Sequence, residues 1–528
     1  MRSMLRPSGP SARSLPSRRG LSAALPQAVR SRRQAPRRRV LATAAPVAPP
    51  AAAPSRSPSA PAPTSSSSSA AAAALVASLP VPLSFEHRPN LRDARGRLML
   101  KNLTLPELEE WCAAVGESPR RGKQLYRSLY RRWIRNLDEE DSAAQAFSAA
   151  FKAKVAASAS LAGGLQLQSV ATARDGTRKL VFALVAEGEE GGPEGEGPST
   201  SDASSSAAVA SSSSSTALAR GTVETVLIPM AGRADGRTRY TACLSTQVGC
   251  AMNCQFCYTG RMGLLGNLST AQIVEQVVEA RRLLAAEGVD IPIANIVFMG
   301  MGEPLHNYDA VMAAIEILAT GLELSRNKII VSTVGLVPEM QRFIASKVAK
   351  LAVSLHATTD EVRDYIVPTN RRYPLEQLLG ALRAAFPYAT RKGDDFVVIE
   401  YVLLAGVNDT REDAVRLLEL TKDIYCLVNL IVFNPHEGTD FQRSAEEDVR
   451  AFRSVFLEAG RPCTLRASKG DDEMAACGQL GDPGLAPRLA PRLRPPQALA
   501  ARLAGAGAGK EGAGAGAAVD KQAEGCAC

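Results

Sequence analysis

Two periodicities of apolar positions alternate along the chain after residue 221. Short apolar runs rich in β-branched residues are separated by longer stretches with an apolar position every three or four residues. The short runs indicate buried parallel strands, and the longer stretches indicate amphipathic helices that cover them. The predicted strands are 238–244, 295–299, 328–333, 349–355, 396–403 and 427–433. The predicted helices are 270–287, 308–318, 337–346, 374–385, 411–422 and 444–459.

Six strand–helix units predict an α/β fold, either an open doubly wound sheet or an incomplete barrel. In both architectures ligands bind at the carboxyl ends of the strands. Upstream, residues 179–186 and 222–228 predict a hairpin whose connection is a Gly/Glu- and Ser/Ala-rich insert at 187–219. We therefore divide the folded part into an N-terminal accessory domain, 86–186, and a catalytic domain, 221–482.

The two ends of the chain have compositions that do not predict a core. Before Glu86 there are twelve arginines, no lysine and no acidic residue, among many Ser, Pro and Ala. Such a composition is typical of an organelle transit peptide, which we place at residues 1–45, followed by a disordered spacer at 46–85. The Ser and Pro content favours the chloroplast, with the mitochondrion as the alternative. The Ala/Gly/Pro-rich segment 483–528 predicts a disordered tail.

Charge and cysteine content exclude several classes of protein. The net charge is +9, but without the twelve N-terminal arginines 50 basic residues face 53 acidic ones, so charge alone does not indicate a nucleic-acid partner. No apolar stretch approaches the ~20 residues that span a bilayer, so we expect no membrane partner. Ten cysteines in 528 residues are too sparse for a disulfide scaffold.

Three cysteines follow the first predicted strand at close spacing. Cys250, Cys254 and Cys257 form a C-x3-C-x2-C pattern. Three thiolates on one loop can hold three irons of a [4Fe–4S] cluster and leave the fourth iron open, whereas electron-transfer clusters use four cysteines. Cys243 is a poorly placed fourth ligand because it lies within the preceding strand. A zinc knuckle or unrelated buried thiols are the alternatives.

Polar or glycine residues also stand at the ends of successive predicted strands. Glycine allows a ligand to approach the backbone closely, and a carboxylate can bind a cationic amine. Each residue alone is more typical of a structural hydrogen bond, but together they predict a ligand site. They are Gly302, Glu303, Ser332, Ser354, His356 and Asn434, and the set includes Leu355, which lies between Ser354 and His356.

The cysteine motif resembles that of the radical S-adenosylmethionine (SAM) superfamily. The resemblance implies a [4Fe–4S] cluster whose open iron binds SAM, and a partial (βα)6 barrel, which agrees with the six units counted above. It also implies that the strand-end residues hold the amine, ribose and adenine of SAM. An electron donor such as flavodoxin or ferredoxin is then needed, and we expect a monomer.

A late cysteine narrows the resemblance. The segments around Cys243, the cysteine motif, Gly302, His356, Asn434 and Gly470–Leu480 together resemble the dual-specificity RNA methyltransferases. That family methylates adenine C2 in large-subunit ribosomal RNA and, in bacteria, certain transfer RNAs. The resemblance implies that Cys477 carries the methyl group as S-methylcysteine, that Cys243 resolves the RNA adduct by forming a disulfide with Cys477, and that Glu224 accepts the proton. Two SAM molecules are used per turnover.

The accessory domain carries a basic helical pattern. Residues 104–115 predict a helix with a Thr104–Glu107 capping box. Residues 119–135 place seven basic side chains among Tyr126, Tyr130 and Trp133, which suits phosphate contacts with an aromatic ring available for stacking. A solvated face above buried aromatics is the alternative.

Two other functions remain open at this point. One is methylation at adenine C8 by the same cysteines and cofactors. The other is a non-catalytic iron–sulfur RNA-binding protein, which leaves Cys477 unexplained.

Overall fold

The computed structural model describes residues 83–93, 95–139, 147–185, 221–231, 237–390, 393, 395–466, 468–482 and 489–508. The expected transit peptide and the 187–219 insert lie outside these residues. The expected spacer does so up to residue 82, whereas Leu83 and Phe85 are buried.

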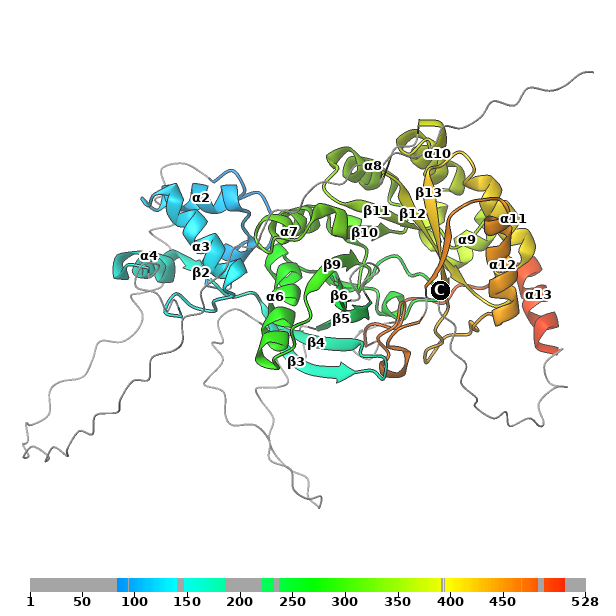
Figure 1. The fold of residues 1–528 in the computed structure, drawn as a ribbon, viewed down its shortest axis with the longest axis horizontal. Helices are drawn as coiled ribbons and strands as arrows, with labels where there is room; N and C mark the ends of the chain where they lie inside the picture. The colour runs from blue at the N-terminus through cyan, green and yellow to red at the C-terminus, as the bar shows by residue number, and fades with distance from the viewer. Residues whose placement is uncertain are drawn as a thin grey trace, which may run out of the picture. The chain divides into compact units, whose positions relative to one another are not determined.

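A ten-stranded sheet organises the described part of the chain (Figure 1). Its order is β14-β13-β12-β11-β10-β9-β6-β5-β4-β3, and all neighbours from β6 to β14 are parallel. The strands β3, β4 and β5 add an antiparallel edge. The bounds are β3 Leu165–Thr172, β4 Arg178–Leu184, β5 Thr222–Met230, β6 Arg239–Cys243, β9 Ile293–Phe298, β10 Ile329–Thr333, β11 Lys350–Ser354, β12 Val397–Leu403, β13 Cys426–Val432 and β14 Cys463–Arg466. The predicted α/β fold with sequential parallel strands is confirmed.

Helices connect the parallel strands, as the apolar period predicts. They are α6 Thr270–Ala286, α7 Tyr308–Thr320, α8 Val337–Ser346, α9 Asp360–Ile366, α10 Leu375–Ala385, α11 Arg411–Leu420 and α12 Glu446–Glu458. Local chemistry fixes where they begin. Ser269, for example, accepts a hydrogen bond from the backbone of Gln272, whose side chain bonds back to Ser269.

Apart from short 3-10 helices, three features of the catalytic region were not predicted: the helix α9, a seventh parallel strand and a small hairpin. A seventh parallel strand, β14, follows α12 and pairs with β13, with Arg466 opposite Ile431. It is too short to show a period. A small hairpin, β7 Gln247–Gly249 and β8 Leu264–Asn267, encloses the cysteine motif.

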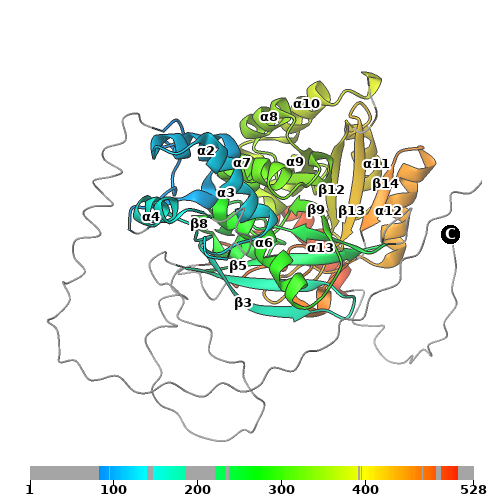
Figure 2. The ribbon, with the colours of Figure 1, turned by 60° about the vertical axis from the view of Figure 1, so that its left-hand side comes forward.

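The accessory region contains α2 Leu105–Ala114, α3 Pro119–Arg131 and α4 Ala149–Ser158, which group together in Figure 2. The predicted capping box of α2 is present, with Glu107 accepting from the Thr104 backbone. Lys101 anchors this region to α6 through a buried ion pair with Glu275, 2.8 Å between Nζ and Oε1.

The basic pattern on α3 divides between surface and core. Arg120, Lys123, Arg127 and Arg131 are exposed. Tyr126 and Tyr130 are buried, which corrects the expectation of an exposed stacking aromatic in the helix. Trp133 lies beyond the end of α3 and has a positive φ of 57°, so it is not part of the helix.

Part of the tail is ordered, contrary to the composition-based expectation for 483–528. Residues 497–508 form α13, Gln497–Ala508. The structured part, residues 489–508, is called the C-terminal strap below. Leu499 and Leu503 explain its attachment, since they pack in an apolar cluster with Phe433 and Phe441. Among the described residues, no helix has the length and hydropathy needed to cross a membrane.

Candidate active site

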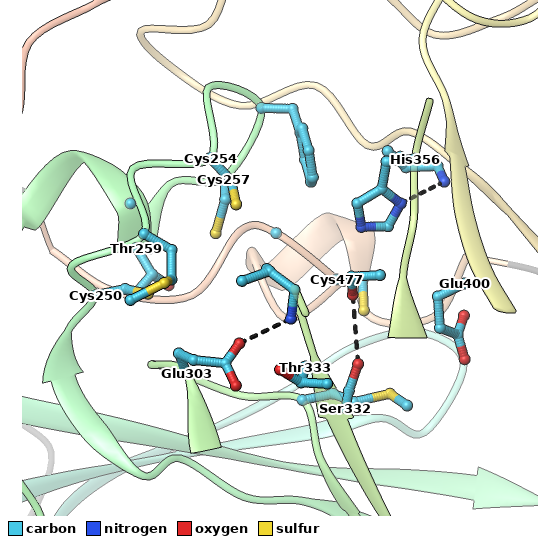
Figure 3. A pocket seen from close by; sticks show the side chains of 18 of the residues that line it. Cys250, Cys254, Cys257, Thr259, Glu303, Ser332, Thr333, His356, Glu400 and Cys477 are labelled. Atoms are coloured by element: carbon cyan, nitrogen blue, oxygen red, sulfur yellow. Dashed lines mark hydrogen bonds between the residues drawn. The ribbon is translucent and has the colours of Figure 1, made fainter. Parts of the chain in front are cut away.

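One cavity opens at the carboxyl ends of the parallel strands (Figure 3). It has about 960 Å³ of empty space including its mouth. Residues from β9, β10, β11, β12 and β13 line it, and the cysteine motif and the loop of Cys477 cover it. The location is the one that the fold class predicts for a ligand site.

The three thiols of the cysteine motif share this cavity. Cys250 and Cys254 are buried and Cys257 is partly buried. Burial raises the pKa of each thiol; the Cys257 sulfur raises the pKa of Cys250 and Cys254 further, and the Cys477 sulfur does the same for Cys257. A positively charged metal group would offset the cost of burying the thiolate forms. The three cysteines therefore fit the role of cluster ligands.

No group of three His, Cys, Asp or Glu side chains in the described residues converges as ligands of one metal ion. Cluster cysteines bind separate irons and do not need such convergence. The donor set of thiols alone therefore fits an iron–sulfur cluster.

Glu303 lies on the cavity wall after a turn that only glycine fits. Gly302 has a φ of 100°, and a Cβ there would stand 2.6 Å from the Gln247 Cβ. The Glu303 carboxylate accepts hydrogen bonds from the backbone of Leu305 at 3.0 Å and Val334 at 2.9 Å. Burial raises its pKa to about 7. An ammonium group bound beside it would favour the carboxylate form.

The other predicted strand-end residues divide between the cavity and its surroundings. Ser332, Ser354 and His356 line the cavity, and the two serine Oγ atoms are 3.4 Å apart. Burial lowers the pKa of His356 to about 3, and its Nδ1 accepts from the Val402 backbone at 3.1 Å. The neutral ring can therefore donate from Nε2. The side chain of Leu355 is buried in the apolar core.

Asn434 lies beside a second, smaller cavity that it shares with Cys477 and Arg466. Its Oδ1 accepts a hydrogen bond from the Ser468 hydroxyl. Asn434, the polar residue predicted after β13, therefore lies next to the Cys477 loop. Cys477 lines both cavities.

Cys477 reaches the main cavity from the segment after β14. The backbone carbonyl of the next residue, Gly478, accepts from Tyr258 N at 2.7 Å, so this segment is bound directly to the cysteine motif. The structure thereby brings together the late cysteine and the C-x3-C-x2-C loop, which lie far apart in the sequence.

Cys243 and Glu224 lie under the Cys477 segment rather than on the cavity wall. Cys243 is buried at the end of β6, and burial raises its pKa to about 12, with a further contribution from nearby Cys477. On the neighbouring strand β5, Glu224 accepts from Gly481 N at 3.0 Å and lies 3.6 Å from Lys179. Burial raises the pKa of Glu224, which makes it a stronger proton acceptor than an exposed glutamate.

Two charged residues at the site, the buried Glu400 and the half-buried Arg466, were missed from the sequence. Glu400 lies on β12 within the cavity lining, and Arg466 ends β14. Arg466 Nη1 donates to Cys477 Sγ at 3.5 Å. The sequence did contain one signal for Glu400, since it is the single carboxylate within the apolar run 396–403. A charge in a buried strand needs a partner, so this position could have been recognised as part of a site.

The C-terminal strap contacts the cysteine motif. Ala490 and Arg261 exchange two hydrogen bonds of 2.9 and 2.7 Å, and Asn253 donates to the Pro491 carbonyl at 3.0 Å. Gln255 accepts from Leu493 N at 2.8 Å. The loop that carries the three thiols is therefore fixed from outside by the tail of the chain.

Comparison with known proteins gives concordant matches. Residues 244–418 match the radical SAM superfamily. The dual-specificity RNA methyltransferase RlmN of Pelobacter propionicus is 42% identical over 72% of this chain and 95% of its own length, and that of Geobacter sulfurreducens is 40% identical over 72% and 91%. The crystal structure of a radical SAM methyltransferase from Sphaerobacter thermophilus is 36% identical, with a TM-score of 0.59 over 72% of this chain and 98% of that one.

Proposed function

Because this chain belongs to the dual-specificity RNA methyltransferases of the radical SAM superfamily, we propose that its cavity methylates an RNA base. The protein is a SAM-dependent methyltransferase with a [4Fe–4S] cluster. Its reaction is methylation of C2 of an adenine in large-subunit ribosomal RNA through S-methylcysteine, with two SAM molecules per turnover. Transfer RNA is a second substrate in this proposal.

Cys250, Cys254 and Cys257 hold the cluster in this proposal, since they are the buried thiols that share the cavity wall. Together, the cluster and SAM supply a hydrogen-abstracting radical when both are bound. Glu303 binds the cationic amine of SAM, and Gly302 leaves room for the backbone approach. Neutral His356 donates to the nucleoside part, as do the two serine hydroxyls. The Leu355 backbone and Asn434 complete the cofactor-binding set.

Cys477, Cys243 and Glu224 carry the methyl transfer. The Cys477 sulfur accepts a methyl group and later carries its carbon to the base. Glu224, with its raised pKa, takes the proton that leaves C2. The Cys243 thiolate then attacks the Cys477 sulfur, so that a disulfide forms and the sulfur–carbon bond breaks. The carbon leaves with the electron pair of that bond and takes up a proton from solvent, which completes the methyl group of the released RNA.

The presence of Cys477 in the same cavity as the three-thiol loop carries this proposal. The test is anaerobic reconstitution with iron, sulfide, SAM and dithionite, followed by addition of ribosomal RNA. We expect 2-methyladenosine in the digested RNA and 5′-deoxyadenosine in the supernatant, both measured by mass spectrometry against standards. Formation of the 8-methyl isomer would reassign the position. RNA binding without 5′-deoxyadenosine would leave a non-catalytic iron–sulfur protein.

Removal of the C-terminal strap should weaken cluster retention. Truncation after Asp482 deletes the hydrogen bonds to Asn253, Gln255 and Arg261, while truncation after Ala508 keeps them. Each such bond contributes about 1 kcal/mol, so the loop should open more often. We expect the chain truncated after Asp482 to lose iron in air about threefold faster, or more, than the chain truncated after Ala508. Iron analysis and visible absorbance measure this loss over time. Equal decay of the two truncated chains would contradict a restraining role.

The remaining partners follow from the same proposal. The exposed cations of α3 contact RNA phosphates, and a small reductase such as flavodoxin or ferredoxin delivers the electron to a monomeric enzyme. Residues 1–45 direct import into the chloroplast, with the mitochondrion as the alternative. Fusion of residues 1–45 to a fluorescent protein tests this: signal in the cytosol alone would contradict organelle import.

A further inference from the structure

Arg466 is hydrogen-bonded to Cys477 and lies near enough to Cys243 and the buried carboxylate of Glu400 to be influenced by both. Its Nη1 donates to Cys477 Sγ at 3.5 Å and contacts Met299 Sδ at 4.0 Å. The charges that act on it come from Cys477 first, then Glu400 and Cys243, and they raise its pKa. The guanidinium therefore stays protonated next to both thiols.

The environments of the two cysteines differ. Cys243 is enclosed at the end of β6, and its thiol has a pKa raised to about 12. Cys477 is partly exposed, lines the cavity and receives the hydrogen bond from Arg466. The thiols of Cys243 and Cys257 also lie near Cys477, and the carboxylates of Glu303 and Glu400 line the main cavity with it. A second cation, Lys469, lines the smaller cavity but pairs with Asp175 at 3.7 Å, whereas Arg466 is bonded to the Cys477 sulfur.

We propose that Arg466 is a positioning residue that selects Cys477, rather than Cys243, as the acceptor of the first methyl group. A guanidinium N–H bonded to sulfur stabilises a thiolate and fixes its direction. The inference goes beyond the proposed function and rests on the role given there to Cys477.

The selected step balances without a further reactant. The Cys477 thiol releases its proton to solvent, and the thiolate attacks the methyl carbon of SAM. A sulfur–carbon bond forms on Cys477, the bond from the sulfonium to that carbon breaks, and S-adenosylhomocysteine leaves. The thioether carries no charge, so Arg466 then pairs with Glu400, whose carboxylate is held by Asn429 at 2.8 Å.

The test uses the Arg466→Met and Arg466→Lys variants of the full chain without RNA. We expect alkylation of Cys477 by iodoacetamide, mapped by mass spectrometry, to be roughly ten- to hundredfold slower near neutral pH in Arg466→Met, with its pH profile moved to more alkaline values. Lysine keeps the charge and should restore part of the rate. With SAM, Arg466→Met should lose methylation of Cys477 to a similar extent.

Two controls make the outcome unambiguous. Arg461→Met removes another guanidinium near a buried thiol, 4.0 Å from Cys426, and should leave Cys477 alkylation unchanged. The double variant Arg466→Met/Glu400→Gln removes the buried carboxylate that the single variant leaves without its cation, so a loss of folding does not mask the result.

An unchanged rate and pH profile in both Arg466→Met chains would overturn the proposal. RNA methylation by Cys477→Ala would instead refute the proposed function, so the two failures are distinguishable.

Discussion

The Cys477→Ala protein is expected to lose RNA methylation roughly a thousandfold or more, while it still cleaves some SAM. The alanine removes the only cavity-lining thiol outside the C-x3-C-x2-C motif among the described residues, and with it the nucleophile of the first transfer. The three cluster thiols and Glu303 are unaltered, so 5′-deoxyadenosine should still form after reduction. Both products are measured in one anaerobic assay by mass spectrometry.

Cys463→Ala is the matched control for this experiment. Cys463 is a buried free cysteine at the start of β14 and does not line the cavity. Methylation by this variant should remain near the wild-type level. If Cys477→Ala methylated RNA as well as Cys463→Ala does, direct transfer from SAM would replace the cysteine-carried route.

Parallel strands and their helices could be predicted because their pattern is local. The run that predicts 396–403 becomes β12 at Val397–Leu403, and the periodic segment 337–346 becomes α8 with the same bounds. The three-thiol loop was predictable for the same reason, since its ligands lie within eight residues. Elements whose stability depends on distant partners gave no comparable signal.

Arg466 and the strap illustrate that second class. β14 is four residues long and is fixed by pairing with β13, so its last residue had no predicted place. The tail is rich in small residues and proline, so its sequence gives little indication of a helix. Leu499 and Leu503 nevertheless pack in an apolar cluster with Phe433 and Phe441. The composition of a segment indicates how much apolar surface it can bury by itself. It does not indicate which apolar surface another part of the chain provides for it to pack against.

The position of Trp133 has a related cause. The spacing of Leu125, Leu129 and Trp133 fits one helical stripe, but α3 ends at Arg131 and Trp133 adopts a positive φ. Arg282 of α6 donates to the Trp133 carbonyl, so a tertiary contact fixes the chain after the helix. A periodic pattern cannot indicate such an ending.

Replacement of Cys243 by alanine should stop the enzyme at a covalent protein–RNA adduct. Once the Cys477 carbon has bonded to the base, release requires a second sulfur to attack Cys477. Cys243 is the thiol placed for that attack, since it is buried at the end of β6 and Cys477 lies near enough to contribute to the raised pKa of its thiol. Turnover should fall to about one per chain or less, and an RNase-sensitive band of higher mass should accumulate on a denaturing gel.

The double variant Cys243→Ala/Cys477→Ala provides the control, since it lacks the sulfur on which the adduct forms. It should show no shifted band, whereas Cys426→Ala, which alters a buried cysteine on β13, should turn over normally without an adduct. Full multiple turnover by Cys243→Ala would assign release to an external thiol. The expectation rests on the burial of Cys243 at the end of β6. A buried thiol reacts slowly with solutes in water, so its reaction partner is the neighbouring Cys477 sulfur.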